Sequence, residues 1–174
     1  MKMKILQLPN PVLRQKSVEI QAVDDEIRKI LNDMLETMYD ARGVGLAAPQ
    51  VGLLQRMVVI DIAAKDEPPQ PFKMVNPVIV WRSEETECGS EGCLSIPNQY
   101  APVERNVAVK VEYLDEKGDK RDLNAEGFLA VAIQHELDHL DGVIFIDHLS
   151  DLRRKMLLKR HEKRLKKATL EEQE

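Results

Sequence analysis

The stretch His135-Glu136-Leu137-Asp138-His139 holds the residues of this chain that are best suited to chemistry. Residues four apart lie on one face of an α-helix, so the two imidazoles can bind a single metal ion. Glu136 would then lie close enough to accept a proton from a metal-bound water. A helix with two histidines and a glutamate also arises on solvated surfaces, so the motif alone supports a hydrolase and a surface helix about equally.

A catalytic metal of this kind usually has three protein ligands and one open position, so a third ligand is needed. Phe145 stands where an H-E-x-x-H-x-x-G-x-x-H motif would place a histidine, which excludes that class of site. Glu162 and Glu171 lie farther along, in a basic or irregular C-terminal region where we do not expect a fixed ligand.

Cys93 is the better candidate for the third ligand, because a thiolate binds transition metals strongly. Most lone cysteines are simply small buried hydrophobes. A second alternative is a closed structural zinc site formed by Cys88, Cys93 and the two histidines. The C-x4-C spacing fits that alternative only marginally, and a closed site has no use for Glu136 beside the metal.

Three helices are predicted around these residues. An amphipathic pattern with Asp24 as N-cap indicates a helix over 24–42. A nearly all-apolar segment, 128–140, carries the histidines and is expected to be buried. Ser150 can cap a third helix that reaches about Lys167. The apolar side expected for this last helix consists of Leu149, Leu152 and Met156.

The middle of the chain is expected to form strands. Their predicted ranges are 56–62, 74–81, 107–113 and 119–124. Pro77 places the second of them at a sheet edge or a bulge. Residues 43–52 are interpreted as a glycine-rich loop. The predicted fold class is α+β, with mainly antiparallel strands around a central helix, an N-terminal helix and a C-terminal helix, in a single domain of residues 1–174.

Composition and charge set broader limits. The 174 residues are 43% hydrophobic and 32% charged, which is typical of a globular protein. No apolar run approaches the ~20 residues of a membrane helix, so no membrane partner is expected. The N-terminus has no signal-peptide core, and the two cysteines fit a reducing compartment, so we expect a cytoplasmic protein.

Three blocks of sequence, taken together, resemble the signature motifs of the peptide deformylases. They are G-V-G-L-A-A-P-Q at 43–50, E-G-C-L-S at 91–95 and Q-H-E-L-D-H at 134–139. The likeness covers about residues 1–165 and keeps the family's order. It implies a metal-dependent hydrolase that releases formate from the N-formyl-methionine of nascent polypeptides.

The resemblance also implies a role for each matching residue. Glu136 would act as general base and then general acid. The Gln50 side chain and the Leu94 N–H would stabilise the oxyanion. The implied ligands of one divalent metal are Cys93, His135 and His139. Ferrous iron is the implied physiological metal, although Zn²⁺, Ni²⁺ or Co²⁺ suits the same donors.

Substrate binding is assigned in part by the same resemblance. The segment Gly43-Val44-Gly45 would pair with the substrate backbone as an added strand. Apolar residues near the histidines could line a methionine pocket, although ordinary core packing explains each of them equally well. The full set expected to bind substrate is Gly43, Val44, Gly45, Glu91, Gly92, Phe128, Val131 and Ala132.

Some positions depart from the better-known bacterial members of the family. Tyr100 stands where several of them carry an arginine thought to contact the peptide beyond methionine. Gly89 replaces a larger apolar residue beside the pocket, and Cys88 is an additional thiol. The expected reaction is unaffected, but the sequence preference beyond methionine is left open.

The C-terminal region is strongly basic. Arg153 to Lys167 holds nine Lys/Arg residues and one Glu, which leaves 16 basic and 29 acidic residues for the rest of the chain. In family members with an extended C-terminal helix, that helix is associated with docking on the ribosome. We expect it to contact ribosomal RNA through phosphates, and a merely solvated helix face is the alternative.

Two other functions stay open at the level of sequence. A metallo-endopeptidase would cut internal amide bonds of unformylated peptides. A non-catalytic, zinc-stabilised binding module would need Cys88 as a fourth ligand and would unfold when the metal is chelated.

Overall fold

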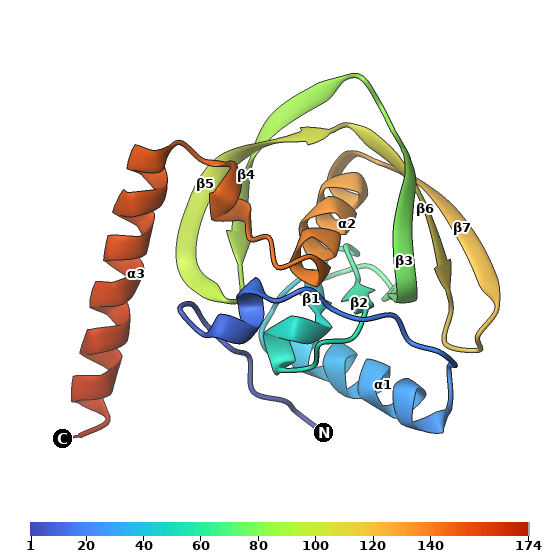
Figure 1. The fold of residues 1–174 in the computed structure, drawn as a ribbon, viewed down its shortest axis with the longest axis horizontal. Coiled ribbons are helices and arrows are strands. Elements are labelled where there is room, and N and C mark those ends of the chain that lie inside the picture. The colour runs from blue at the N-terminus through green and yellow to red at the C-terminus, as the bar shows by residue number, and fades with distance from the viewer. Residues whose placement is uncertain (174) are drawn as a thin grey trace.

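The computed structural model describes residues 1–173 (Figure 1). Three α-helices occur within this range: α1 (Asp25–Asp40), α2 (Gly127–Leu140) and α3 (Asp151–Glu171). The predicted α+β class is confirmed, and α2 is the central helix that carries the two histidines. No helix of the described residues is both long and apolar enough to cross a membrane.

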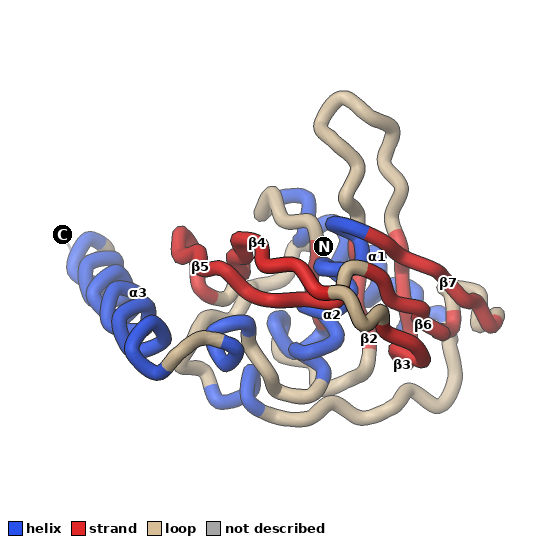
Figure 2. Tube along the Cα trace, turned by 90° about the horizontal axis from the view of Figure 1, so that it is seen from above, coloured by secondary structure: helices blue, strands red, loops and turns tan. Residues whose placement is uncertain are grey.

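Five strands form one antiparallel sheet in the order β1-β2-β3-β6-β7. Their bounds are β1 Gly45–Ala47, β2 Met57–Ile60, β3 Phe72–Arg82, β6 Ala108–Leu114 and β7 Lys120–Glu126. Two further strands, β4 (Thr86–Cys93) and β5 (Ile96–Asn106), form a separate antiparallel pair. Helix α2 lies between the two sheets, as the views in Figure 1 and Figure 2 agree.

The apolar residues of α2 explain its central position. One core cluster joins Ala130, Ile133 and Leu137 of this helix to the inner face of the five-stranded sheet, including Val58 and Val111. Burial of such side chains is the main driving force for folding. The packing fixes α2 along its length, and it therefore also fixes the direction in which the histidine-bearing turns project.

The prediction for α1 is confirmed. The Asp24 side chain accepts a hydrogen bond from the Ile27 N–H at 2.9 Å and so caps the helix. Pro77 lies at an irregularity of β3, where the register with β6 shifts between Val75 and Val78. Since β3 has partners on both sides, the bulge rather than the sheet edge accommodates this proline.

In the strand region one sequence prediction is wrong, and one pair of strands was missed. Residues 43–52 are not a uniform loop, because they contain β1 and a short 3-10 helix, Ala48–Val51. The pair β4 and β5 was not predicted at all. Most of β4 is exposed and polar, so its sequence shows no alternation of apolar and polar residues.

The predicted helix α3 is present, but the side of the helix that was predicted to be buried is wrong. Ser150 caps the helix through the Arg153 N–H, as expected, but the helix continues to Glu171. Leu152 and Met156 are 70% and 49% exposed, whereas Leu157 and His161 are the buried residues. Leu149 is buried just before the helix. The helix stands to one side of the molecule in Figure 1, so only a narrow part of its surface is covered.

Candidate active site

Cys93, His135 and His139 meet where the end of β4 approaches α2. Their possible ligand atoms all lie within 4.8 Å of one another, and Cys93 Sγ is 3.4 Å from His139 Nε2. The two histidines come from successive turns of α2. Cys93 ends β4 at a shift of register between Gly92 and Cys93, where a bulge can redirect a side chain.

The chemistry of these three donors fits one transition-metal ion. A thiolate and two imidazoles suit iron, zinc, nickel or cobalt, and three protein ligands leave a position open for water or substrate. Burial lowers the pKa of His139 well below its ordinary value, so this imidazole is neutral, which is the form that binds a metal. The other donors considered from sequence do not join the cluster. Cys88 is exposed, and Glu162 and Glu171 lie on the surface of α3. Phe145, which stands where another class of site has a histidine, stacks its ring against His135.

A charged network holds His135 in one orientation. Its Nδ1 lies 2.9 Å from Glu91 Oε1, which leaves Nε2 for a metal. Arg105 donates two hydrogen bonds to Glu91, at 2.9 and 3.0 Å, and a third to Asp138 at 2.7 Å. Burial alone would raise the pKa of Glu91, but the bonds from His135 and Arg105 lower that pKa to about 2. Glu91 is therefore a permanent carboxylate that orients the imidazole.

Glu136 differs from Glu91 because it has no ion partner at hydrogen-bond distance. Its Oε1 is 4.0 Å from His135 Nε2, and its buried Oε2 has no hydrogen bond among the described residues. Burial raises the pKa of Glu136 to about 7. A Cβ at Gly45 would collide with the carboxylate, so the absence of a side chain there lets Glu136 lie against β1.

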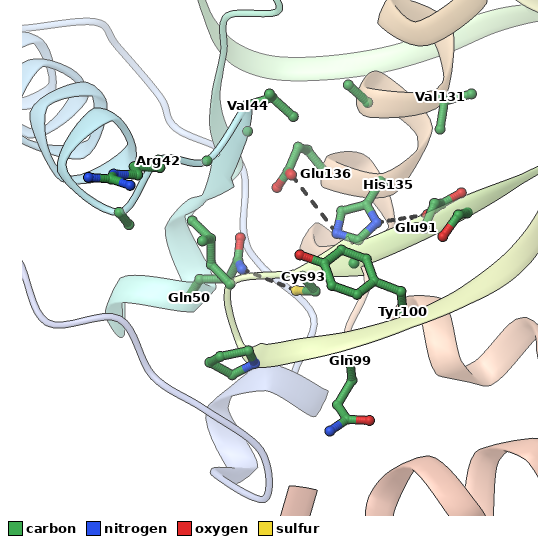
Figure 3. Close-up of a pocket in the computed structure, with 18 of the residues that line it drawn as sticks. Arg42, Val44, Gln50, Glu91, Cys93, Gln99, Tyr100, Val131, His135 and Glu136 are labelled. Carbon is green, nitrogen blue, oxygen red and sulfur yellow. Dashed lines mark hydrogen bonds and ion pairs between the residues drawn. The ribbon is translucent and has the colours of Figure 1, made fainter. Parts of the chain in front are cut away.

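Gln50 is fixed inside the site and is not a surface loop residue. Its side chain is buried, and Oε1 accepts a hydrogen bond from the Ala47 N–H at 2.9 Å. The amide nitrogen donates to Ser95 Oγ at 3.1 Å. It also lies 3.5 Å from Cys93 Sγ, a contact marked in Figure 3. The amide nitrogen therefore faces Ser95 and the proposed metal ligand Cys93, with an orientation set by the bonds to Ala47 and Ser95.

The loop before β1 and the turn after β4 are in close contact. A Cβ added at Gly43 would lie 2.7 Å from Leu94 Cδ1, so the leucine side chain occupies the space beside the glycine. The Gly43 N–H donates to the Met38 carbonyl at 2.9 Å, which ties the loop to the end of α1. These contacts bring the first and second sequence blocks to the same side of the metal ligands.

A cavity of about 590 Å³ opens beside the cluster. Of the residues predicted to form the site, all except the buried His139 line it. Val44 and Phe128 are partly exposed at the cavity, whereas Ala132 also belongs to the core. Sequence reasoning assigned no role in the site to several other lining or supporting residues. They are Arg42, Ser90, Pro97, Asn98, Gln99, Ser95 and Arg105.

Arg105 could have been found from sequence. Ala101, Val103 and Arg105 alternate along β5 and all point inward, so the arginine occupies an apolar position of the pattern. A charged residue at such a position requires a buried partner. Ser95 is the last residue of the resembling block E-G-C-L-S, but nothing in the sequence indicated its hydrogen bond to Gln50.

Comparison with known proteins identifies the family of this chain. A sequence profile described as polypeptide deformylase matches residues 2–155. The chain belongs to the polypeptide deformylase family. Peptide deformylase of Rhizobium meliloti is 50% identical over 159 residues, which are 91% of each chain. Family membership gives the reaction class, the metal-dependent removal of a formyl group from nascent peptides.

Solved deformylase structures share the fold over nearly the whole chain. Peptide deformylase from Ehrlichia chaffeensis superposes with a TM-score of 0.93 at 34% identity, covering 97% of this chain and 99% of that one. A second structure of the Ehrlichia chaffeensis deformylase, in complex with actinonin, superposes with a TM-score of 0.89 at 36% identity, covering 94% and 97%.

Proposed function

We propose that this chain releases formate from N-formyl-methionyl nascent polypeptides, with Glu136 as general base and acid. The ligands of its single divalent metal would be Cys93, His135 and His139. The observation that carries this proposal is the cluster of three donors beside a buried carboxylate that lacks a partner. When bound, the cation would acidify a water molecule and polarise the formyl oxygen.

Glu136 is suited to move a proton in both directions. With a pKa of about 7, its carboxylate and carboxylic acid are both accessible at neutral pH. We assign it to accept the proton of the attacking water and to return it to the departing amine. The free Oε2 supports this role, because no protein group has to be displaced first.

Gln50 and Leu94 are proposed to stabilise the oxyanion that develops on the formyl group. The Gln50 amide is already oriented toward Cys93 by its bonds to Ala47 and Ser95. The Leu94 N–H follows Cys93 directly in the chain. A preorganised donor of this kind is typically worth about 3 kcal/mol of transition-state stabilisation.

The peptide is proposed to bind as an added strand along β1. This strand is at the edge of its sheet, with β2 on one side only, and Gly43, Val44 and Gly45 line the cavity on the other. Glu91 and Gly92 of β4 line the same cavity. Backbone pairing would supply affinity independent of sequence. The proposed methionine pocket consists of Val44, Phe128, Val131 and Ala132.

One assay tests the reaction and the role of Glu136. Formate release from formyl-Met-Ala-Ser is compared between the wild type and Glu136→Gln, with Glu112→Gln on the exposed face of β6 as a matched control. We expect kcat to fall by about 10²- to 10⁴-fold in the first variant, as is usual when a general base is lost. The control variant should retain wild-type rates.

The same assay separates the alternatives. Undiminished formate release by Glu136→Gln would refute the role given to this residue. Internal cleavage of unformylated peptides would favour a metallo-endopeptidase. Unfolding on chelation would favour a zinc-stabilised module, but the exposed Cys88 supplies no fourth ligand for such a site.

Ferrous iron is proposed as the physiological metal. The Cys93 thiolate would make an iron-loaded site sensitive to oxidation. We expect activity to decay in air faster for protein loaded anaerobically with Fe²⁺ than for protein loaded with Ni²⁺ or Zn²⁺. Equal lifetimes of the three forms would contradict the assignment.

We further propose that residues 1–174 form one domain in the cytoplasm and that α3 docks on ribosomal RNA. Lys155, Lys159 and Lys163 repeat at every fourth position, are exposed and make no ion pair among the described residues. Reversing all three to Glu should weaken ribosome binding at low salt and flatten its salt dependence. A matched control reverses Lys65, Lys117 and Lys120, which are exposed elsewhere. Equal binding by both triple variants would exclude α3 as the docking element.

A further inference from the structure

Arg42 is the unusual residue at the outer part of the cavity. It follows the last residues of α1 and lines the cavity together with Gly43 and Val44. Apart from His135, it is the one cationic side chain among the lining residues. Its guanidinium has no hydrogen bond or ion pair with any other residue in the described range 1–173. In Figure 3 it lies on the far side of the cavity from Cys93 and His135.

The acidic residues of the cavity do not neutralise this charge. Glu91 is bound to Arg105 and His135, and Glu136 is buried beside the metal ligands. The whole chain carries a formal charge of −5, so the unpaired positive charge at the substrate cavity is opposite in sign to the net charge of the protein. The unpaired guanidinium is therefore available to a group on the substrate.

The backbone conformation of Arg42 is one that disfavours any residue with a side chain. Arg42 has a φ of 57°, in the left-handed region, and it ends α1 with bonds from Arg42 N to Tyr39 O and from Gly43 N to Met38 O. Glycine is the usual residue at this position of a helix end, because it has no Cβ to strain. The fold thus holds an arginine where glycine would be less strained.

The site also sets which part of a peptide reaches Arg42. Glu136 lies against Gly45, so the formyl end of the substrate belongs near Gly45. An added strand that leaves this point must pass Val44 and then Gly43, at about 3.3 Å per residue. Tyr100 bounds the opposite side, since its ring lies over Gly92. The third residue of the peptide then lies beside Arg42.

We infer that Arg42 gives this enzyme a preference for an acidic side chain at the third residue of formyl-methionyl peptides. The inference rests on the proposed function, because it assumes that the substrate lies along β1 with its formyl group at Glu136. Arg42 determines specificity in this scheme and takes no part in the chemical step.

The test uses three amidated peptides, formyl-Met-Ala-Glu, formyl-Met-Ala-Gln and formyl-Met-Ala-Lys, so that no terminal carboxylate competes. For the full-length metal-loaded enzyme at low ionic strength, we expect kcat/KM to rank Glu above Gln above Lys. Each step should be about two- to fivefold, as for a solvent-exposed ion pair. The ranking should arise in KM and should shrink in 0.5 M salt.

Variants at position 42 identify the source of the preference. Arg42→Gln should abolish the ranking, and Arg42→Glu should reverse it. Lys117→Glu changes the net charge by the same amount as Arg42→Glu at an exposed site outside the cavity, and it should keep the ranking. Arg42→Gly should lose the ranking while raising the thermal midpoint, which a purely structural role for the arginine would not produce.

The outcomes distinguish this inference from the proposed function. Equal kcat/KM for the three peptides with the wild type, or a ranking that survives Arg42→Gln, would overturn the assignment of Arg42. No formate from any of the three peptides would instead count against deformylation itself.

Discussion

The metal-ligand cluster and helix α3 differ in what determines the positions of their functional side chains. Cys93 and His135 of the cluster come from two separate elements, and Gln50 beside them comes from a third. Neighbouring groups hold each of these side chains in place. Helix α3 is 21 residues long, yet only Leu157 and His161 are buried. Chemistry thus depends on contacts between distant parts of the chain, whereas the basic helix presents its charges through its own periodicity.

The difference predicts how each region responds to substitution. Removing one group of the cluster leaves other buried polar groups without partners, so effects there should be large and coupled. Exposed positions on α3 should be changeable one at a time with little effect on the reaction. The predictions below test this contrast from its largest expected effect to its smallest.

Cys93→Ala should produce the largest effect, because it removes one of three metal ligands. We expect metal affinity to fall by more than the ~10- to 100-fold that loss of an outer hydrogen-bond partner costs, and formate release to fall with it. Cys88→Ala is the matched control and should keep one bound metal per chain, as measured by elemental analysis. Loss of metal from the Cys88 variant would revive the closed four-ligand site.

Gln50→Ala should lower kcat by about 10²- to 10³-fold, because it removes a fixed donor to the oxyanion. Metal content should stay at one ion per chain, which separates this effect from that of Cys93→Ala. Gln21→Ala, at an exposed position before α1, is the control. A change confined to KM would show that Gln50 binds the ground state and not the transition state.

Glu91→Gln should weaken metal binding by about 10- to 100-fold, since a neutral amide orients His135 less firmly and leaves Arg105 poorly paired. Competition with a chelator measures this affinity directly. Glu87→Gln, at an exposed position on the same strand, should have no effect. Unchanged affinity in the Glu91 variant would show that packing alone orients His135.

Leu157→Ala should have the smallest effect on the reaction. It opens a cavity between α3 and a cluster that includes Leu8 and Phe145, which should lower the free energy of unfolding by about 2–5 kcal/mol. Leu152→Ala, at an exposed position, should change it by less than about 0.5 kcal/mol. We expect both variants to keep kcat/KM within twofold. A large loss in the Leu157 variant would show that α3 and the metal ligands are coupled.

The same contrast explains how far the sequence allowed prediction. Residues within one helix have fixed spacing, so His135, Glu136 and His139 could be placed together from the sequence, and Asp24 and Ser150 were identified as caps. Cys93 was favoured as a ligand, and the three resembling blocks supported it. Its approach to α2 depends on the register of β4 and β5, which local pattern did not reveal.

The buried face of α3 shows the other limit. Apolar Leu152 and Met156 looked like the contact face, but both are exposed. The buried residues of α3 are Leu157 and His161, and Leu158 is partly buried against the same apolar cluster as Leu157. His161 lies 2.8 Å from the Leu8 carbonyl, a contact with the opposite end of the chain. The spacing of apolar residues predicts that a helix forms, but it does not show which part of the helix surface the rest of the protein covers.

The contact between Gly43 and the Leu94 side chain has a consequence for protein engineering. A methyl group added at position 43 would occupy the present place of Leu94 Cδ1, so the leucine side chain must either move aside or be shortened. Substitutions at position 43 are therefore best sampled together with changes at position 94 in one library.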